Sequence, residues 1–189
     1  RVAMGLRVKS GELAFANDLK RPAWAHQRML FGFLVAMQHG VITADCGTGK
    51  TYVALSFIDW FKKKRGAVKA LVACPISIID EAWGEDTSNL TDLRWASLWL
   101  PQPYVNAEER RDGQTQAAKR HEQQLDVLWR TDVDIWVANF ETVRNPVILK
   151  QLVKRKFDIV IIDEATKIKS PTSKSFKALS KLSDAAEQR

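Results

Sequence analysis

The stretch Ala44-Asp45-Cys46-Gly47-Thr48-Gly49-Lys50-Thr51 decides how the rest of the chain is interpreted. It follows a short apolar run over 41–44 and leads into a segment, 52–61, whose apolar residues recur with helical periodicity. A strand, a glycine-containing loop and a helix N-terminus in this order form a cradle for anions, because backbone N–H groups point inward and the helix dipole adds partial positive charge. Gly47 and Gly49 let the backbone approach an anion closely, since neither carries a Cβ atom. The stretch therefore predicts a phosphate-binding loop.

The loop follows the pattern G-x-x-x-x-G-K-[ST], except that Ala44 stands where the first glycine belongs. In this pattern the ammonium of Lys50 reaches the β- and γ-phosphates of a nucleotide, and the hydroxyl of Thr51 binds Mg²⁺. A chance Gly-Lys-Thr in a surface turn is the alternative, but strand and helix patterns flank the loop where its function requires them. The residues that we expect to bind the nucleotide here are Asp45, Cys46, Gly47, Thr48, Gly49, Lys50 and Thr51.

Composition indicates one soluble globular domain, which we place over residues 1–189 because 46% of the residues are hydrophobic and 27% are charged. No apolar run approaches the about 20 residues that a membrane-spanning helix needs. The net charge of +7 favours a polyanionic partner, although the basic runs 62–65 and 154–156 fall at helix ends, where the helix dipole favours cations in any protein. Cys46 and Cys74 match no metal-ligand spacing and are expected to be reduced, buried thiols.

Short apolar segments alternate with helical patterns along the chain. The expected strands are 41–44, 68–74, 94–100, 134–138 and 157–163. The expected helices are 24–38, 52–61, 76–83, two parts of 105–130 separated at Asp112-Gly113, 146–153 behind an Asn145 N-cap, and 173–184. The residues that should face inward are Met29, Leu30, Phe33, Leu34 and Met37 in the first helix, and Phe176, Leu179 and Leu182 in the last. Apolar strands that alternate with helices are typical of a mainly parallel sheet covered on both faces, so the expected fold class is α/β.

An acidic pair, Asp163-Glu164, follows the apolar run Ile159-Val160-Ile161-Ile162. In parallel α/β sheets, ligands bind at the edge where the strands end, so these carboxylates should lie near the phosphate loop. We expect Asp163 to bind Mg²⁺ and Glu164 to orient and help deprotonate an attacking water, with Lys50 as the third catalytic residue. The alternative, in which the two acids only begin the next loop, is common for a lone Asp-Glu pair. It is less common behind a buried strand that follows a phosphate loop.

The acidic pair carries a family resemblance. Asp163-Glu164-Ala165-Thr166 resembles motif II of superfamily 2 helicases. The longer run from Asp163 to Lys174 resembles the DEAH-x-x-K-N-x-x-S-K signature of the sucrose-non-fermenting, or chromatin-remodeller, type of ATP-dependent DNA translocase. Thr166 stands where that signature has histidine, and Ser170 where it has asparagine. The histidine links motif II to other helicase motifs, so its replacement affects that coupling rather than the groups that bind Mg²⁺ and activate water.

Other segments resemble further helicase motifs in the family's order. Residues 22–27 resemble the Q motif, which implies that Gln27 reads adenine. An exposed glutamine on a helix is the alternative. Residues 71–77 resemble motif Ia, and 137–142 resemble motif Ib, often written V-I-N-Y-E-T. The residues that this resemblance places near the DNA backbone are Pro75, Ser77, Asn139 and Thr142.

The resemblance covers about residues 13–184 and implies an N-terminal RecA-like lobe of a DNA translocase, with ATP and Mg²⁺ as cofactors. Its partners would be double-stranded DNA, bound without sequence preference, and a second RecA-like lobe of the same protein. Motif III and the arginine finger of that second lobe are expected beyond residue 189, so the isolated lobe should hydrolyse ATP very slowly. The expected location is the cytoplasm of a bacterial or phage-infected cell, or the nucleus of a eukaryote. The alternatives are the motor of a strand-separating helicase or restriction enzyme, and a nucleotide- or DNA-binding module without turnover.

Overall fold

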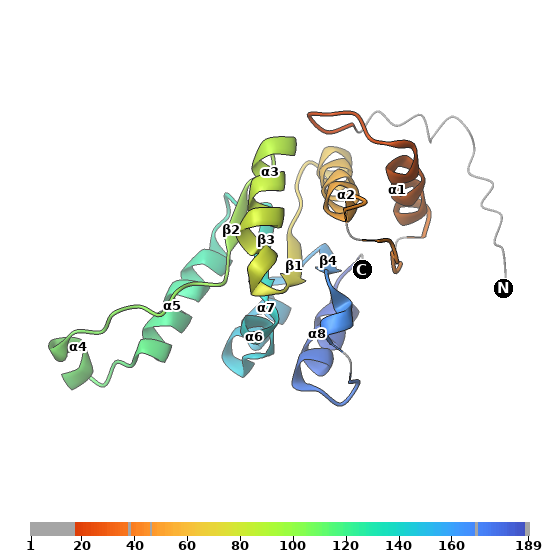
Figure 1. The fold of residues 1–189 in the computed structure, drawn as a ribbon. Coiled ribbons are helices and arrows are strands. Elements are labelled where there is room, and N and C mark those ends of the chain that lie inside the picture. The colour runs from red at the N-terminus through yellow and green to blue at the C-terminus, as the bar shows by residue number, and fades with distance from the viewer. Residues whose placement is uncertain (1–17, 38, 46, 169, 188–189) are drawn as a thin grey trace.

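The computed structural model describes residues 18–37, 39–45, 47–168 and 170–187. Four parallel strands form one sheet in the order β2-β3-β1-β4 (Figure 1). The strands are β1 (Ala70–Cys74), β2 (Trp95–Ser97), β3 (Ile135–Asn139) and β4 (Ile159–Ile162). Their register is continuous across the sheet, since Ala73 of β1 lies opposite both Ala138 and Ile162. The expected parallel sheet is therefore confirmed, with four of the five expected strands.

Helices connect the strands. The α-helices are α1 (Ala25–Met37), α2 (Lys50–Arg65), α3 (Glu85–Leu90), α4 (Ala107–Arg111), α5 (Gln116–Trp129), α6 (Phe140–Arg144), α7 (Pro146–Arg155) and α8 (Lys174–Ala185). The expected break at Asp112-Gly113 separates α4 from α5, and Asn145 caps α7 as expected, because its Oδ1 accepts hydrogen bonds from the N–H groups of Val147 and Ile148. Among the described residues, no helix is both long and apolar enough to cross a membrane.

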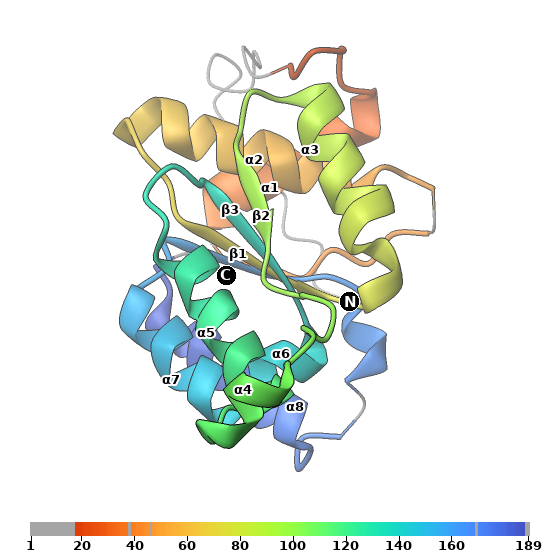
Figure 2. The ribbon, with the colours of Figure 1, turned by 90° about the vertical axis from the view of Figure 1, so that its left-hand side faces the viewer.

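The sheet is covered on both faces, as expected for an α/β fold (Figure 2). Successive residues of a strand point to opposite faces, so Val72 and Leu71 of β1 belong to different cores. The core on one face is completed by α1, α2 and the segment that ends in α3. The core on the other face is completed by α5, α6, α7 and α8. Every residue of β1 and β3 is buried, which explains their nearly continuous apolar sequences.

The expected strand over 41–44 does not form, which corrects the sequence-based prediction. Residues 41–45 have no regular secondary structure, and the side chain of Val41 is 81% exposed. The carbonyl oxygens of Ala44 and Asp45 accept hydrogen bonds from the ammonium of Lys50. At Ala44, the last residue of the expected strand, a local bond therefore occupies the carbonyl that strand pairing would use.

Two expected helix faces also need correction. In α1 the fully buried residues are Gln27, Phe31 and Gly32. Of the predicted stripe, Leu30 and Leu34 pack against the core, while Met29 and Met37 are exposed. This helix is apolar around most of its circumference, so periodicity could not identify the face that packs on α2. In α8, Leu179 and Leu182 are buried as predicted, but Phe176 near the start of the helix is exposed.

The segment after β1 was expected to be one helix over 76–83. It consists instead of a short 3₁₀ helix, Ile76–Ile78, and a π-helical turn, Ile79–Gly84, that continues into α3. The wider turn places Ile79 and Trp83 in the core. π-helical turns are rare and occur frequently at functional sites.

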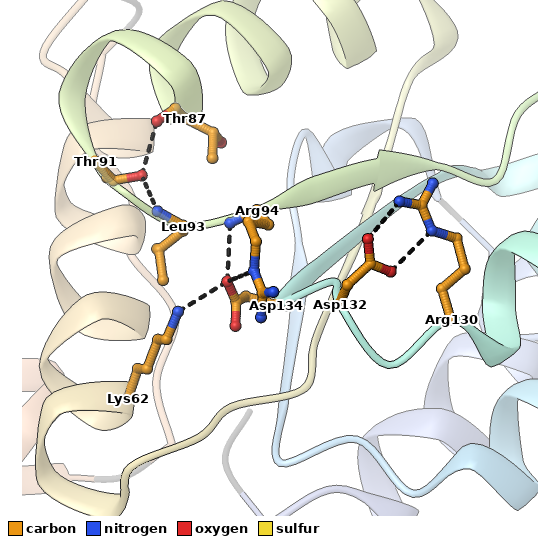
Figure 3. Close-up of polar contacts among 8 residues, drawn as sticks. All are labelled: Lys62, Thr87, Thr91, Leu93, Arg94, Arg130, Asp132 and Asp134. Carbon is orange, nitrogen blue, oxygen red and sulfur yellow. Dashed lines mark hydrogen bonds and ion pairs between the residues drawn. The ribbon is translucent and has the colours of Figure 1, made fainter.

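Asp134 joins the elements at the amino edge of the sheet (Figure 3). Its Oδ2 accepts hydrogen bonds from Lys62 Nζ in α2, at 2.9 Å, and from the backbone N–H of Arg94 before β2, at 2.8 Å. Burial opposes ionisation of this carboxyl, but the hydrogen bonds from Arg94 and Lys62 outweigh it and hold the pKa of Asp134 below its ordinary value. Nearby, Arg130 lowers the pKa of the exposed Asp132 carboxyl to about 2 through their hydrogen bonds.

We expect Asp134→Ala to lower the free energy of unfolding by about 1–3 kcal/mol, because the N–H of Arg94 loses its acceptor and Lys62 loses its partner. The pKa of Asp134 is depressed in the folded state, so its contribution is present above about pH 4 and is lost as the pH falls through the folded value. Urea unfolding at about pH 7 and about pH 3 measures both effects. Asp132→Ala is the matched control, because the side chain of Asp132 is 56% exposed and its loss should change stability little. Equal losses in the two variants would contradict this role for Asp134.

Candidate functional site

The phosphate loop lies at the carboxyl edge of the sheet. The short connection 66–69 joins the end of α2 to the start of β1, and α2 runs back across the face of the sheet (Figure 2). The N-terminus of α2 therefore lies toward the edge where β1 and β4 end. Four N–H groups at a helix N-terminus have no partner within the helix, so the start of α2 presents donors and the positive end of its dipole at this edge.

Two glycines shape the loop as the sequence predicted. Gly47 and Gly49 have φ of 79° and 75°, in the left-handed region that favours glycine. A Cβ atom added at Gly49 would lie 2.3 Å from Gln27 Nε2, so the Gln27 amide would have to move to admit any other residue. At Gly47 a Cβ atom would meet no atom within 4 Å. Cys46, one of the expected nucleotide ligands, lies outside the described residues.

The ammonium of Lys50 lies over the loop. It donates hydrogen bonds of 3.0 Å to the carbonyl oxygens of Ala44 and Asp45. The hydroxyl of Thr48 donates to the same Asp45 oxygen at 2.8 Å. These bonds hold the cation beside the start of α2, where the helix also favours an anion. Thr51 follows in the first turn and is half-buried.

Gln27 and His26 connect α1 to the loop through one carbonyl oxygen. Gln27 is only 5% exposed, and its Nε2 donates to the Thr48 oxygen at 3.4 Å while its Oε1 accepts from the N–H of Trp24 at 2.9 Å. The His26 Nε2 lies 3.0 Å from the same Thr48 oxygen. The sequence alternative of an exposed glutamine is thus wrong. Contact between Gln27 and adenine stays a prediction, and the contact of His26 with the loop was not foreseen.

The acidic pair follows β4 at the same edge of the sheet. The N–H of Asp163 donates to the Ala73 oxygen at 2.9 Å, which extends the pairing of β4 with β1 by one residue. Asp163 Oδ2 accepts a hydrogen bond of 3.1 Å from the indole N–H of Trp83, and its Oδ1 accepts one of 2.8 Å from the N–H of Glu164. The carboxylate is therefore fixed in orientation from two sides. Trp83 itself is a buried core residue, 1% exposed.

Glu164 has an unusual backbone conformation, with φ of 53° and ψ of 44°. A residue other than glycine in this left-handed region costs about 1–3 kcal/mol, and such strain is concentrated at functional sites. Glu164 is half-buried and begins the 3₁₀ helix Ala165–Lys167. Thr166, which stands where the resembling family has histidine, is exposed on that short helix.

Cys74 ends β1 beside the acidic pair. Burial raises the pKa of its thiol to about 12, and the negative charge of Asp163 adds to the shift. The thiol therefore stays protonated and is a poor nucleophile or metal ligand. This agrees with the prediction of a buried, reduced cysteine. Within the part of the chain that the structure describes, no cluster of three or more His, Cys, Asp or Glu side chains is arranged to hold a metal.

The residues predicted to contact DNA lie at or just beyond the carboxyl ends of β1 and β3, which are neighbours in the sheet. Ser77 is exposed and Pro75 is half-buried. Asn139 and Thr142 are each only 5% exposed. Asn139 Oδ1 caps α6 by accepting a hydrogen bond of 3.0 Å from the N–H of Thr142. The structure thus gives Asn139 a role in folding, and the contact of these four residues with DNA stays a prediction.

We expect Gly49→Ala to destabilise the chain more than Gly47→Ala. Both substitutions place alanine at a positive φ, which costs about 1–2 kcal/mol, but only the first drives a methyl group into the buried Gln27 amide. The additional loss for Gly49→Ala, measured by urea unfolding, should be about 1 kcal/mol or more, the contribution of one hydrogen bond. Indistinguishable unfolding curves for the two variants would contradict the tight contact between Gln27 and the loop.

The comparisons with known proteins agree with this architecture. The chain resembles the solved Sulfolobus solfataricus SWI2/SNF2 ATPase core in complex with dsDNA, with a TM-score of 0.66 and 23% identity over 90% of this chain. It is similar to the Sulfolobus solfataricus SWI2/SNF2 ATPase core domain, with a TM-score of 0.66 and 24% identity over 92% of the chain. The match covers 32% of each of those chains. These likenesses confirm the predicted RecA-like fold.

A curated relative and a family profile extend the comparison. The Zorya protein ZorD of Escherichia coli O139:H28 (strain E24377A / ETEC) is 26% identical over 140 residues, which cover 70% of this chain but 12% of that protein. The chain thus spans about an eighth of this relative. The profile of the family "Type III restriction enzyme, res subunit" matches residues 22–187. This match includes the phosphate loop and the acidic pair, and it confirms the expected superfamily 2 helicase-like lobe. The chain belongs to the family of the type III restriction enzyme res subunit.

Proposed function

We propose that the chain is the ATP-binding lobe of an ATP-dependent translocase that moves on double-stranded DNA. The observation that carries the proposal is the position of two groups at the carboxyl edge of one parallel sheet. The phosphate loop begins α2, and the fixed carboxylate of Asp163 with its neighbour Glu164 follows β4. A nucleotide triphosphate bound as Mg²⁺–ATP needs a cationic cradle on one side and carboxylate groups on the other.

The residues present fit Mg²⁺–ATP. In protein sites Mg²⁺ keeps several waters and takes one or two carboxylates together with substrate phosphates, so a cluster of three protein ligands is not required. The hydroxyl of Thr51 and the carboxylate of Asp163 would hold the ion, and it would neutralise charge on the phosphates. Lys50 would exchange its bonds to the loop carbonyls for bonds to the β- and γ-phosphates. Glu164 would accept a hydrogen bond from the attacking water and orient it.

The support for DNA as the second ligand is less direct than the support for ATP. The similar SWI2/SNF2 core was solved with dsDNA, and the chain carries a net charge of +7. Membership in the res-subunit family equally favours the motor of a restriction enzyme, which keeps the nucleotide chemistry and changes only its use. A nucleotide- or DNA-binding module without turnover is the remaining alternative. A second lobe in the same protein and a cytoplasmic location in a bacterial cell belong to the proposal as well.

We expect Lys50→Ala to weaken ATP binding by about tenfold or more, the effect of losing one charged hydrogen bond, while the fold stays intact. The matched control is Lys63→Ala, since Lys63 is an exposed residue of the same helix that pairs with Asp59. Titration of each variant with a fluorescent ATP analogue measures the affinity, and circular dichroism checks the fold. Equal affinities for the wild type and Lys50→Ala would overturn the nucleotide site.

The second expectation concerns Trp83. Trp83→Phe removes the indole N–H that orients Asp163, so Mg²⁺ should support ATP binding only at about tenfold higher concentration, as for other residues that orient a metal ligand. ATP binding without Mg²⁺ should not change. Trp136→Phe is the matched control, because Trp136 is equally buried and its indole donates to the Val127 oxygen, at 3.0 Å, rather than to Asp163. The same Mg²⁺ dependence in both variants would show that Trp83 acts only through packing.

A further inference from the structure

Two aromatic side chains at the start of α1, Trp24 and His26, lie beside the phosphate loop. His26 Nε2 lies 3.0 Å from the carbonyl oxygen of Thr48, and the ring centroids of Trp24 and His26 are 5.6 Å apart. Both side chains are exposed, and Trp24, at 61%, is the most exposed of the seven tryptophans in the chain. A nucleotide whose phosphates lie in the loop would therefore have an open aromatic surface next to it.

Trp24 has a fixed backbone although its ring is open to solvent. Its N–H donates to Gln27 Oε1 at 2.9 Å, and its carbonyl oxygen accepts from the N–H of Arg28 at 3.0 Å. The rings of Trp24 and His26 are tilted by 53°, so neither ring covers the face of the other as it would in a parallel stack. The surface is thus formed before a ligand arrives, and a preformed site loses less entropy when it binds.

Gln27, in contrast, is not open to a base. It is only 5% exposed, its Oε1 accepts from the N–H of Trp24, and its Nε2 donates to the Thr48 oxygen at 3.4 Å. An amide that reads adenine presents its oxygen and its nitrogen to the base together. Here both atoms bond to the chain itself, and breaking these bonds would leave buried polar groups unsatisfied. Gln27 is therefore a positioning residue that holds the phosphate loop against α1.

Stacking and hydrogen bonding select a base in different ways. Hydrogen bonds distinguish adenine from guanine, because position 6 carries an amino group in one and a carbonyl oxygen in the other. An aromatic ring contacts the face of the base instead, and every base has such a face, so stacking tolerates a change of base. An aromatic surface without a free amide therefore recognises that a base is present and does not distinguish the two purines.

We propose that Trp24 stacks on the base of the bound nucleotide, with His26 beside it, and that the site takes ATP and GTP alike. This differs from the helicase resemblance, which implies that Gln27 reads adenine. The inference rests on the proposed function, since it concerns the nucleotide bound at the same loop. It extends the substrate class from ATP to purine nucleoside triphosphates and makes Trp24 the residue that selects for a base.

The test is calorimetric titration of the 189-residue chain, with Mg²⁺ present, using ATP, GTP and inorganic triphosphate, which has no base. The wild type should bind ATP and GTP with similar affinity. Trp24→Ala should weaken the binding of both by about tenfold, within the range for the loss of one stack between a base and an aromatic ring. Its affinity for inorganic triphosphate should not change. Trp24→Phe keeps an aromatic ring and should keep most of the affinity.

Two further variants serve as controls. Trp129→Ala removes another exposed tryptophan, which ends α5 and has the cations of Lys154 and Arg155 over its ring. This variant should change none of the three affinities. Gln27→Ala removes a contact with the loop and should weaken the binding of all three ligands by the same factor. Circular dichroism checks that each variant is folded.

The inference and the proposed function fail in different ways. A preference of the wild type for ATP over GTP by about tenfold, the contribution of one hydrogen bond, that is lost in Gln27→Ala would overturn the inference. Equal ATP affinities for Trp24→Ala and the wild type would also overturn it, as would an equal loss of ATP and inorganic triphosphate binding in Trp24→Ala. Each of these results leaves the nucleotide site in place. If the wild type binds none of the three ligands, the proposed function is wrong as well.

Discussion

The pairing of β1 with two parallel neighbours is the constraint on which the rest of the structure depends. β1 lies between β3 and β4, all five of its residues are buried, and its backbone groups are satisfied by these two strands. A strand buried on both faces needs helices above and below, and parallel strands need connections that return to the same edge. The chain meets both requirements at once, because its helices form those connections. All strand ends then meet at one edge, and the loop of α2 and the acidic pair lie there.

One contact joins two of these groups. The segment from Pro75 to Gly84 begins at the end of β1 with residues predicted to lie near DNA, and it ends in the π-helical turn that carries Trp83. The indole of Trp83 reaches Asp163 at the end of β4. A displacement of this segment would therefore change the orientation of the carboxylate. The segment from Pro75 to Gly84 thus connects residues predicted to contact DNA with Asp163, the predicted Mg²⁺ ligand.

Sequence reasoning succeeded where a signal is local. The apolar runs of β1, β3 and β4 and the Asn145 cap of α7 were predicted because each depends on residues adjacent in the chain. It failed for 41–44, which form no strand and where the carbonyl of Ala44 is bonded to the distant ammonium of Lys50. It was only partly right for α1, where Leu30 and Leu34 pack on the core but Met29 and Met37 are exposed, since that helix is apolar nearly all round.

The two edges of the sheet are its shortest strands, with three residues in β2 and four in β4. At a free strand edge another chain can add a strand by pairing with the open backbone groups. A longer edge strand offers more of these groups. Here an arriving strand would find only a few backbone groups on either side, followed at β4 by the charges of Asp163 and Glu164. The small number of open backbone groups therefore limits aggregation through strand pairing at these edges. This protects a domain whose central strands, Ala70–Cys74 and Ile135–Asn139, are apolar enough to aggregate if they became exposed.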